Sequence, residues 1–502
     1  MGARERTRGR LGGWVYLTAG LLLAAALLWA IAGVGFVNYD TLYGLVWGQQ
    51  LSRGEVPQYG LPIAPTPHPL VEALGLGLSP LGASAMTDIV VALAFIALAG
   101  CGWLVYRLGS EWFGRAAGAL AAAILLTRVP ILSYGVRAYV DIPYLLLVLG
   151  ALLVETRRPR AGAPVLVLLG FAGLLRPEAW AFSAVYWLYL AVPCLRARGL
   201  HSAALPGAFR MPRAGSDVRT PRRLAGLALL AVAAPAIWVL SDLLVTGDAM
   251  WSLTNTKHTA LTLGRKTGIG NVPEYIPRRI GAILRPPVLV GAALGGVLSL
   301  LWLRERARIG AAAGVLAVVV FAAMAAFGLP IDERFAFGAA AILCVFCAAG
   351  VFGWMALDPG DRRRGPWMAA GAIVLVGLVV ALPGQLSSAH SQLSSLARQQ
   401  SIQNDLVALV DDHAITLRCG PVGVPNHAPI PLLALRLGAP PAQIVSAEAK
   451  QIESGTYVDP ASVEVEREYI LDPHDPHMPV SIPPGFTEAT GNHSWLLFKR
   501  CA

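Results

Sequence analysis

Long apolar stretches, separated by short polar connections, occupy the first three quarters of the chain. A helix needs about 20 mostly apolar residues to cross the hydrocarbon core of a bilayer. Several stretches reach that length, so the pattern predicts about eleven transmembrane helices in a polytopic α-helical membrane domain covering 1–385. The expected spans are 14–37, 86–106, 116–134, 139–154, 163–175, 178–195, 224–246, 282–302, 309–329, 335–357 and 367–385.

Arginines in the short connections set the expected orientation. Cytoplasmic loops of membrane proteins carry an excess of Lys and Arg. With the N-terminus in the cytoplasm, every arginine-rich connection faces the cytoplasm, and an odd number of spans puts the C-terminus outside. We therefore predict a multi-pass protein of the bacterial plasma membrane with an extracytoplasmic C-terminal domain. The arginine-rich connections are 106–115, 155–162, 196–223, 303–308 and 357–366.

Composition supports the membrane assignment and limits the partners. The 502 residues are 55% hydrophobic and only 14% charged, whereas soluble domains carry about 25% charged residues. The net charge of +10 reflects the arginine-rich connections, so the basic balance does not indicate binding to nucleic acid. The lipid bilayer is the first expected partner.

The composition changes at 386–502, where polar residues replace the apolar runs. A helical periodicity, then strand-like segments at 414–419 and before Cys501, predict a small α/β extracytoplasmic domain. Cys419 and Cys501 both lie in it, and an oxidising compartment favours a disulfide between them. The histidines at 472–477 have no metal-ligand spacing and indicate a turn. Acceptor binding is the expected role of this domain.

Ionisable residues gather at the helix ends that are expected to face outward. They include Asp40, which follows the first span, and the "DER" of 332–334. Charges at membrane depth cost a few kcal/mol unless they are paired or lie in a wet cavity. Their concentration on one face predicts a shared polar cavity with carboxylates and an anion site. The residues are Asp40, His68, Arg137, Asp141, Arg176, Glu178, Asp332, Glu333 and Arg334.

Each of these residues also has a purely structural interpretation. Asp40 and Asp141 can cap the helices that follow them. Arg137 can extend toward outer phosphates, Arg176 can pair with Glu178, and "DER" can be a solvated turn. The sequence alone leaves these alternatives open.

Two segments between spans are expected to lie outside. The first outer loop, 37–85, contains an amphipathic aromatic-rich stretch and a proline-rich approach to the second span. The other, 247–281, is rich in Gly and Thr and carries Lys257 and His258. Connections of that length are usually functional or disordered, so we predict a flexible lid.

The first outer loop resembles that of the GT-C glycosyltransferases, which use polyprenyl-phosphate-linked sugars and include protein O-mannosyltransferases and aminoarabinose lipid A transferases. The likeness begins with the acid of "YDTLYGLVWGQQLSRGEVPQYGLP" and continues through "PTPHPL", "RAYVDIPY", "LLRPEAWAFSAVYWLY" and "DERFAFGAAAILCVFCAAG". It covers roughly 14–385. Thr41 follows Asp40 here, whereas many relatives carry a second acid there, so no cofactor is assigned and a divalent metal is left open.

The resemblance implies an inverting transfer of a sugar from a polyprenyl-phosphate donor to a glycan, lipid or protein acceptor of the cell envelope. Catalysis is expected from Asp40 as general base and Asp141 as the second acid, and donor phosphate binding from Arg279, Arg285 and Arg334. A lipid or solute transporter and a non-catalytic envelope assembly protein are the alternatives. Supporting contacts to substrate are expected from Tyr39, Tyr43, His68, Arg137, Arg176, Glu178, Glu333, Lys257 and His258.

Overall fold

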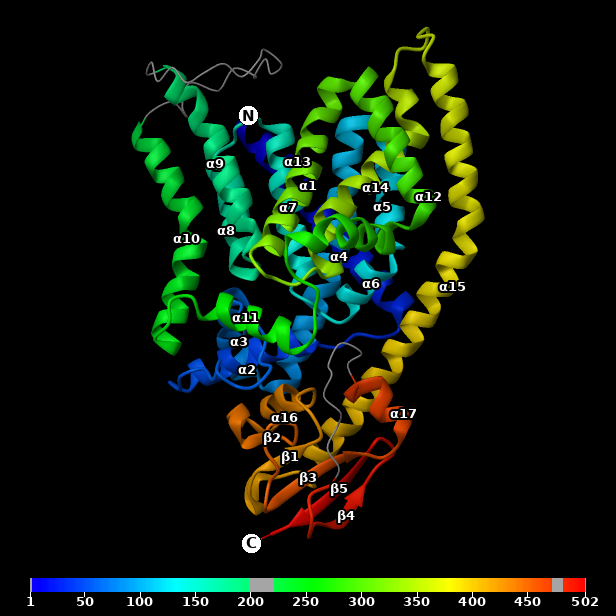
Figure 1. Ribbon diagram of the computed structural model, residues 1–502. Coiled ribbons are helices and arrows are strands. Elements are labelled where there is room, and N and C mark those ends of the chain that lie inside the picture. Colours follow the sequence, from blue (N-terminus) through cyan, green and yellow to red (C-terminus); the bar gives the residue numbers. More distant parts are fainter. Residues whose placement is uncertain (1, 198–220, 472–481, 502) are drawn as a thin grey trace.

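A long helical bundle and a small sheet-containing domain at one end of it make up the chain in the computed structural model (Figure 1). The structure describes residues 2–197, 221–471 and 482–501. The arginine-rich connection over 198–220 and the histidine-containing turn predicted at 472–477 lie outside the described residues.

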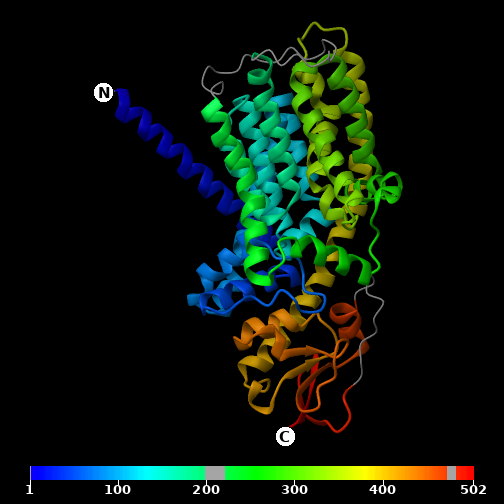
Figure 2. The same ribbon diagram turned by 60° about the vertical axis from the view of Figure 1, so that its left-hand side comes forward.

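The bundle contains a helix for each of the apolar runs that the sequence shows. The helix α1 (Gly2–Ala32) extends away from the others toward its N-terminal end (Figure 2). The remaining helices are α4 (Ala83–Phe113), α5 (Arg115–Leu126), α6 (Val129–Val136), α7 (Asp141–Arg157), α8 (Ala163–Leu175), α9 (Glu178–Ala197), α10 (Pro221–Thr246), α12 (Val272–Trp302), α13 (Arg304–Ala326), α14 (Phe337–Phe352) and α15 (Arg364–Asp411).

The chain is a multi-pass membrane protein. Within the described ranges, seven helices are long and apolar enough to cross a bilayer. The number becomes eight if α5 and α6, which meet at a bend of 65°, form one broken span. Other apolar helices, such as α8, are shorter, so a total of eleven crossings stays a prediction.

Helix α12 is broken at Arg285, which has φ 64° and ψ 159°. Pro286 and Pro287 follow the break. A residue before proline is pushed out of the α region, and proline has no N–H to donate to the preceding turn. The "RPP" sequence therefore divides α12 into two helical pieces.

The first outer loop forms a layer between the bundle and the sheet domain. It contains α2 (Tyr39–Ser52), α3 (Pro69–Leu78) and a short 3₁₀ turn, η1 (Ser79–Leu81). Most of α2 is buried, including Tyr43 and Trp47 at 0% exposure. The amphipathic helix predicted from the sequence is thus enclosed by protein on several sides.

The C-terminal domain is carried by α15, which runs without interruption through the predicted boundary at 385/386. Its sheet has the order β2-β1-β3-β5-β4. The β1 strand pairs in parallel with β2 and β3, and β5 pairs antiparallel with β3 and β4. The strands are β1 (Val422–Val424), β2 (Ile444–Ser446), β3 (Gly455–Pro460), β4 (Thr487–Gly491) and β5 (Trp495–Arg500), with α16 (Ile430–Leu437) and α17 (Val463–Val465) beside them.

One detail of the predicted domain is wrong and another agrees with the structure. The segment 414–419 is not a strand; it ends in a 3₁₀ turn over Leu417–Cys419, and the first strand begins at Val422. A disulfide joins Cys419 to Cys501, 82 residues apart. It ties the end of β5 to the segment that leads into β1.

A shared core fixes the C-terminal domain on the first outer loop. Trp47 of α2, Leu406 of α15 and Val424 of β1 belong to one buried apolar cluster. At its edge, Arg53 Nη1 donates to the carbonyl of Gly438 at 2.5 Å, and the Ala442 N–H donates to the side chain of Gln58 at 3.0 Å. The domain is therefore packed against α2 rather than tethered by a linker.

Candidate functional site: a polar cavity between the bundle and the C-terminal domain

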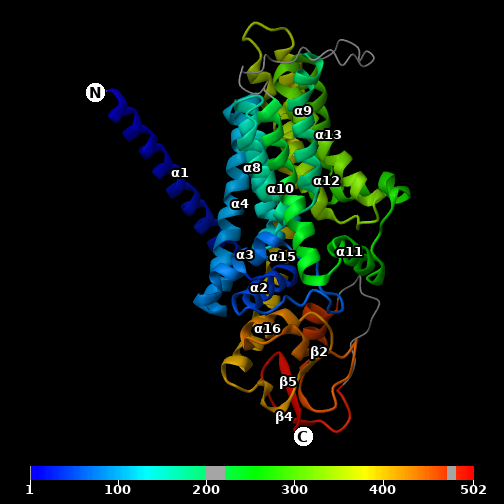
Figure 3. The ribbon, with the colours of Figure 1, turned by 90° about the vertical axis from the view of Figure 1, so that its left-hand side faces the viewer.

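A cavity of about 790 Å³ lies where the first outer loop, the bundle and the C-terminal domain meet. Figure 3 shows the elements that surround this junction, with α2 and α11 (Trp251–Thr262) above α16. Its ionisable wall comes from segments far apart in the sequence. These residues are Asp40, His68, Arg137, Arg176, Glu178, Asp242, Arg265, Arg334, His427 and Glu468.

Asp40 stands in the first turn of α2 and faces the cavity. The helix is capped by Asn38, whose Oδ1 accepts from the backbone N–H of Thr41 at 3.1 Å. Asp40 Oδ2 instead accepts from Arg334 Nη1 at 3.0 Å. The alternative that Asp40 caps this helix is therefore wrong, because Asn38 does so.

The charges around Asp40 hold it in the ionised form. Burial raises the pKa of Asp40, but the neighbouring positive charges, with Arg334 first, outweigh burial and leave this pKa below its ordinary value. Asp332 lies 3.6 Å from Arg334 Nε and 3.5 Å from Arg265 Nη1. Asp40, Arg334, Asp332 and Arg265 thus alternate in charge, but Asp332, which was expected in the cavity wall, lies outside it.

Arg137 adds a positive charge that forms no ion pair with a carboxylate of the described residues, although the Glu333 carboxylate is near enough to interact with it electrostatically. Its guanidinium lies over the rings of Tyr134 and Tyr139, 5.3 and 4.9 Å from their centroids. Its only hydrogen bond to the described residues is a 3.4 Å contact from Nε to the carbonyl of Ser133. Together with Arg265 and Arg334 it makes this part of the cavity suitable for an anion.

Asp141 lies behind this surface in a buried ion cluster. Arg176 pairs through Nη1 with Asp141, and through Nε and Nη2 with Glu178 Oε1 at 2.8 and 2.7 Å. Asp141 is 1% exposed and does not line the cavity, whereas Arg176 and Glu178 do. The Arg176–Glu178 pairing that the sequence left open is present, and it includes Asp141.

Several other residues that the sequence assigned to the same site lie outside the cavity in the structure. Arg279 Nε donates to the carbonyl of Ile331 at 3.0 Å, and Arg285 lines a different pocket. Tyr39 lines the cavity, and its hydroxyl donates to the Ile63 carbonyl at 3.1 Å. The expected site residues that do not line the cavity are Tyr43, Asp141, Lys257, His258, Arg279, Arg285 and Glu333.

The segment 247–281 is not the flexible loop that its Gly and Thr content predicts. It contains α11, a 3₁₀ turn η3 (Ile269–Asn271) and the start of α12. The Thr66 and Thr256 hydroxyls lie 2.5 Å apart, and Asn255 donates to the Ala64 carbonyl at 3.2 Å. These hydrogen bonds to the first outer loop stabilise a helix whose composition alone does not favour one.

Sequence reasoning did not assign to the site four acidic or basic residues that line the cavity: Arg265, Asp242, His427 and Glu468. Arg265 was visible as an outer cation, but only the fold brings it to Asp332. Asp242 lies at the end of an apolar run and accepts from the Ser252 backbone N–H at 2.8 Å and from its hydroxyl at 2.7 Å. The other two come from the C-terminal domain, whose position no local signal reveals.

The sequence leaves open whether the site binds a divalent metal. Within the ranges that the structure describes, no group of three or more His, Cys, Asp or Glu side chains is arranged to hold a metal ion.

His68 provides a test of the cavity's electrostatics through stability. Burial is the main cause that lowers the pKa of His68, and the charges of Arg176 and Arg334 lower it further. The negative charge of Asp40 raises it, but the net effect is a pKa of about 4. An unfolded histidine has a pKa of about 6.5. The unfolded chain then binds more protons between these values, so stability falls as the pH drops from 6.5 toward 4, by up to about 3 kcal/mol.

We expect His68→Gln to flatten the dependence of the melting temperature on pH in this range, measured in detergent by thermal unfolding. His258→Gln, which changes an exposed histidine, is the matched control and should keep the wild-type slope. An unchanged slope in His68→Gln would show that His68 titrates as a solvent-exposed histidine.

The arrangement described above has the fold of solved ArnT structures. The crystal structure of ArnT from Cupriavidus metallidurans bound to undecaprenyl phosphate matches with a TM-score of 0.56 and 13% identity, over 97% of this chain and 98% of that one. The same protein in the apo state matches with a TM-score of 0.51 and 14% identity over the same shares. No family model and no curated protein matches the chain. The GT-C resemblance seen in the sequence is thus confirmed for the fold.

Proposed function

We propose that this protein is an inverting glycosyltransferase that moves a sugar from a polyprenyl-phosphate donor to a cell-envelope acceptor. The observation that carries the proposal is the presence of an ionised carboxylate, Asp40, in the same cavity as three arginines, Arg137, Arg265 and Arg334. The likeness to ArnT, whose structure holds undecaprenyl phosphate, supports the same assignment.

Each group then has a defined task. The acceptor hydroxyl gives its proton to Asp40 while its oxygen attacks the anomeric carbon. The bond between that carbon and the phosphate oxygen breaks, and the phosphate leaves with the bonding electrons. Arginines directed at the leaving phosphate stabilise the charge that develops on it.

The ion pair between Asp40 and Arg334 links donor binding to the base. Without donor, Arg334 keeps Asp40 ionised. A bound phosphate would compete for this guanidinium, and its own negative charge would raise the proton affinity of Asp40. The base would therefore become stronger when the leaving group is in place.

The placement of Asp141 supports inversion rather than retention. A retaining enzyme needs a nucleophilic carboxylate about 5–5.5 Å from its partner acid. Asp141, the expected second acid, is paired with Arg176 outside the cavity wall. We propose that Asp141 positions Arg176 and that a single displacement at the anomeric carbon occurs beside Asp40.

The two remaining walls suggest where the other substrate groups lie. Apolar residues of α13 (Val320, Ala323 and Met324) line the side of the cavity toward the bundle, as an isoprenoid chain requires. Gln403, His427 and other polar residues line the side formed by the C-terminal domain. We propose that the lipid enters beside α13 and that the acceptor contacts the C-terminal domain.

The assay that tests the proposal follows both halves of the donor. Purified protein in liposomes is given a polyprenyl-phosphate sugar labelled in the sugar, with envelope glycan, lipid A-type lipid or protein as acceptor. A transferase releases polyprenyl phosphate as labelled acceptor forms. Movement of the intact donor across the bilayer would favour the transporter alternative. If the protein binds the donor but neither transfers the sugar nor moves the donor, the envelope assembly protein is favoured.

Donor binding gives a sharper prediction about the arginines. The double variant Arg137→Gln, Arg265→Gln should bind the polyprenyl donor at least tenfold more weakly, since a hydrogen bond to a charged group contributes about 1.5–3 kcal/mol. Binding is measured by titration of the solubilised protein with labelled donor. Arg278→Gln is the control, because Arg278 pairs with Glu274 at an exposed site. Wild-type affinity in the double variant would remove these arginines from the donor site.

Membrane orientation is the second prediction of the proposed function. We propose a cytoplasmic N-terminus and an extracytoplasmic C-terminal domain, which places the cavity at the outer face. A single cysteine introduced at Arg363 should react with a membrane-impermeant maleimide only after the cells are opened, whereas one at exposed Glu488 should react in intact spheroplasts. The reverse pattern would overturn this orientation.

A further inference from the structure

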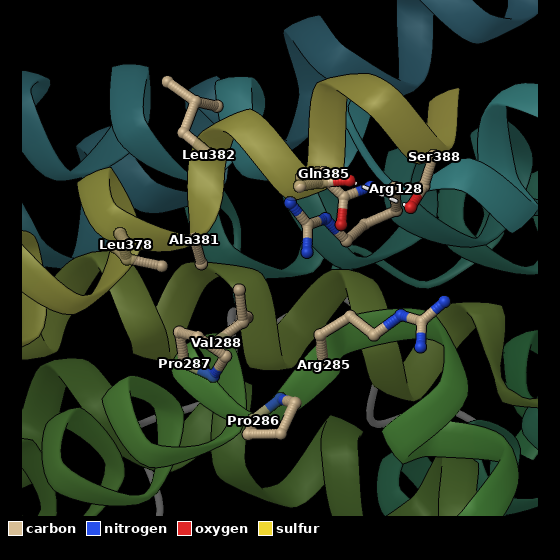
Figure 4. Close-up of a pocket in the computed structure, with 11 residues that line it drawn as sticks. Arg128, Arg285, Pro286, Pro287, Val288, Leu378, Ala381, Leu382, Gln385 and Ser388 are labelled. Carbon is tan, nitrogen blue, oxygen red and sulfur yellow. Dashed lines mark hydrogen bonds between the residues drawn. The ribbon is translucent and has the colours of Figure 1, made fainter. Parts of the chain in front are cut away.

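A second, smaller pocket of about 260 Å³ lies where the break in α12 meets α15 and the start of α6 (Figure 4). It shares no lining residue with the cavity around Asp40. Its polar wall contains Arg128, Arg285, Gln385 and Ser388, and its lining includes no acidic residue. Two arginines thus contribute to the lining of one pocket, which contains no acid among the described residues, and their guanidinium groups point in different directions (Figure 4).

Arg128 is only 6% exposed, and its hydrogen bonds can be counted. Nε donates to the Ile124 carbonyl at 3.1 Å, Nη1 to the Leu284 carbonyl at 3.0 Å, and Nη2 to the Thr127 hydroxyl at 3.1 Å. An arginine has five N–H donors. Two of them are therefore left over among the described residues, on a side chain that lines the pocket.

A structural role for Arg128 explains part of this arrangement. Its bonds join the Ile124 carbonyl at the end of α5 to the Leu284 carbonyl just before the break in α12, where a helix leaves its carbonyls without intrahelical partners. Arg285 has no such explanation. It makes no hydrogen bond or ion pair with the described residues, and it occupies φ 64°, a conformation that residues other than glycine rarely adopt.

The pocket also has an apolar side that continues into the lipid-facing surface of α15. Leu378, Ala381 and Leu382 line it. The neighbouring Val380 and Leu386 are 74% and 53% exposed, as expected of side chains that contact lipid tails.

The depth of the pocket fits the position of a lipid headgroup. Arg285 is 17 residues, about 25 Å of helix, from the far end of α12, and Leu382 is 18 residues, about 27 Å, from the start of α15. The hydrocarbon core is about 30 Å thick. The pocket therefore lies near the edge of the apolar layer on the side of the C-terminal domain.

We propose that this pocket binds the phosphate of an acidic phospholipid, with Arg128 and Arg285 as the two cationic partners. The α12 helix restarts at Pro286 and Pro287, which have no backbone N–H to donate, so only the dipole of its second piece adds to the attraction for an anion. The acyl chains lie along Leu378 and Leu382. The site is separate from the donor site and does not depend on the proposed activity.

Native mass spectrometry of the full-length protein, delipidated and then titrated with phosphatidylglycerol or phosphatidylcholine, tests this inference. The variant is Arg285→Gln, because Arg285 is exposed and supports no described contact. Arg278→Gln, an exposed arginine of the same helix, is the matched control. Wild type and Arg278→Gln should retain phosphatidylglycerol over phosphatidylcholine, and Arg285→Gln should lose that preference by about tenfold.

Three outcomes would overturn the proposal. Equal retention of both lipids by the wild type would show no acidic-lipid site, and full retention by Arg285→Gln would place the site elsewhere. Displacement of phosphatidylglycerol by millimolar inorganic phosphate would identify a free-phosphate site. As a second readout, phosphatidylglycerol should raise the melting temperature of the wild type and of Arg278→Gln but not that of Arg285→Gln.

Discussion

Asp40→Asn is expected to reduce sugar transfer by about 100-fold or more while donor binding and folding are largely kept. The amide cannot take the proton of the acceptor hydroxyl, so the general base is lost. The helix keeps its cap, because Asn38 and not Asp40 accepts from the Thr41 N–H. The rates are measured with labelled polyprenyl-phosphate sugar, and the melting temperature is recorded on the same preparation.

The control for this variant is Asp88→Asn, which removes an exposed carboxylate of α4 outside the cavity and should leave the rate unchanged. Near-normal transfer by Asp40→Asn would mean that another group is the base, and Asp242 and Glu468, which also line the cavity, would be examined next. Because the pKa of Asp40 in the donor-free protein lies below its ordinary value of about 4, its protonation should not limit kcat/KM, which reports the free enzyme, above pH 5.

The sequence predicts the membrane class well because long apolar runs have few other interpretations. The GT-C likeness also follows from local features, namely an acid after the first span and the aromatic helix behind it. The count of crossings is less certain, since α8 has only 13 residues and α5 and α6 meet at a sharp bend. Local hydropathy does not distinguish a short span from half of a broken one.

The site itself is predicted only in part, because residue type does not reveal direction. Arg285 and Arg334 both lie on the expected outer side, yet the break in α12 places Arg285 in the pocket beside α15, while Arg334 contacts Asp40. Asn38 and Asp40 are both capping residues by type, and only the structure shows which side chain reaches the Thr41 N–H. Long-range packing decides each of these cases.

The segment 247–281 also shows that a local sequence pattern does not reveal long-range contacts. The sequence "TNTKHT" contains residues with moderate helix propensity, so a loop was a reasonable expectation. In the structure, Asn255 and Thr256 contact the first outer loop more than 180 residues earlier in the chain. Tertiary hydrogen bonds, which no local pattern contains, make this segment a helix that lines the cavity.

The buried cluster around Arg176 separates a structural cation from the proposed donor-binding cations. Arg176 is 5% exposed and pairs with Asp141 and Glu178, which are 1% and 5% exposed. Its guanidinium also lies 4.4 Å from the centroid of the Phe335 ring, next to Arg334. Loss of Arg176 would leave two carboxylates in an enclosed site without a counter-charge.

Arg176→Gln is therefore expected to destabilise the fold by about 3–5 kcal/mol, the usual cost of breaking a buried pair from one side. The measurement is the melting temperature and the yield of monodisperse protein in detergent. Arg137→Gln is the matched control: Arg137 lines the same cavity without a carboxylate partner, so its loss should weaken donor binding and leave stability nearly unchanged.

The triple change Asp141→Asn, Arg176→Gln, Glu178→Gln should recover much of the stability, because it also removes the two carboxylate charges that would otherwise be buried without a partner. If Arg176→Gln were as stable as the wild type, Asp141 and Glu178 would have to be protonated already. Asp141 would then again be a candidate for proton transfer.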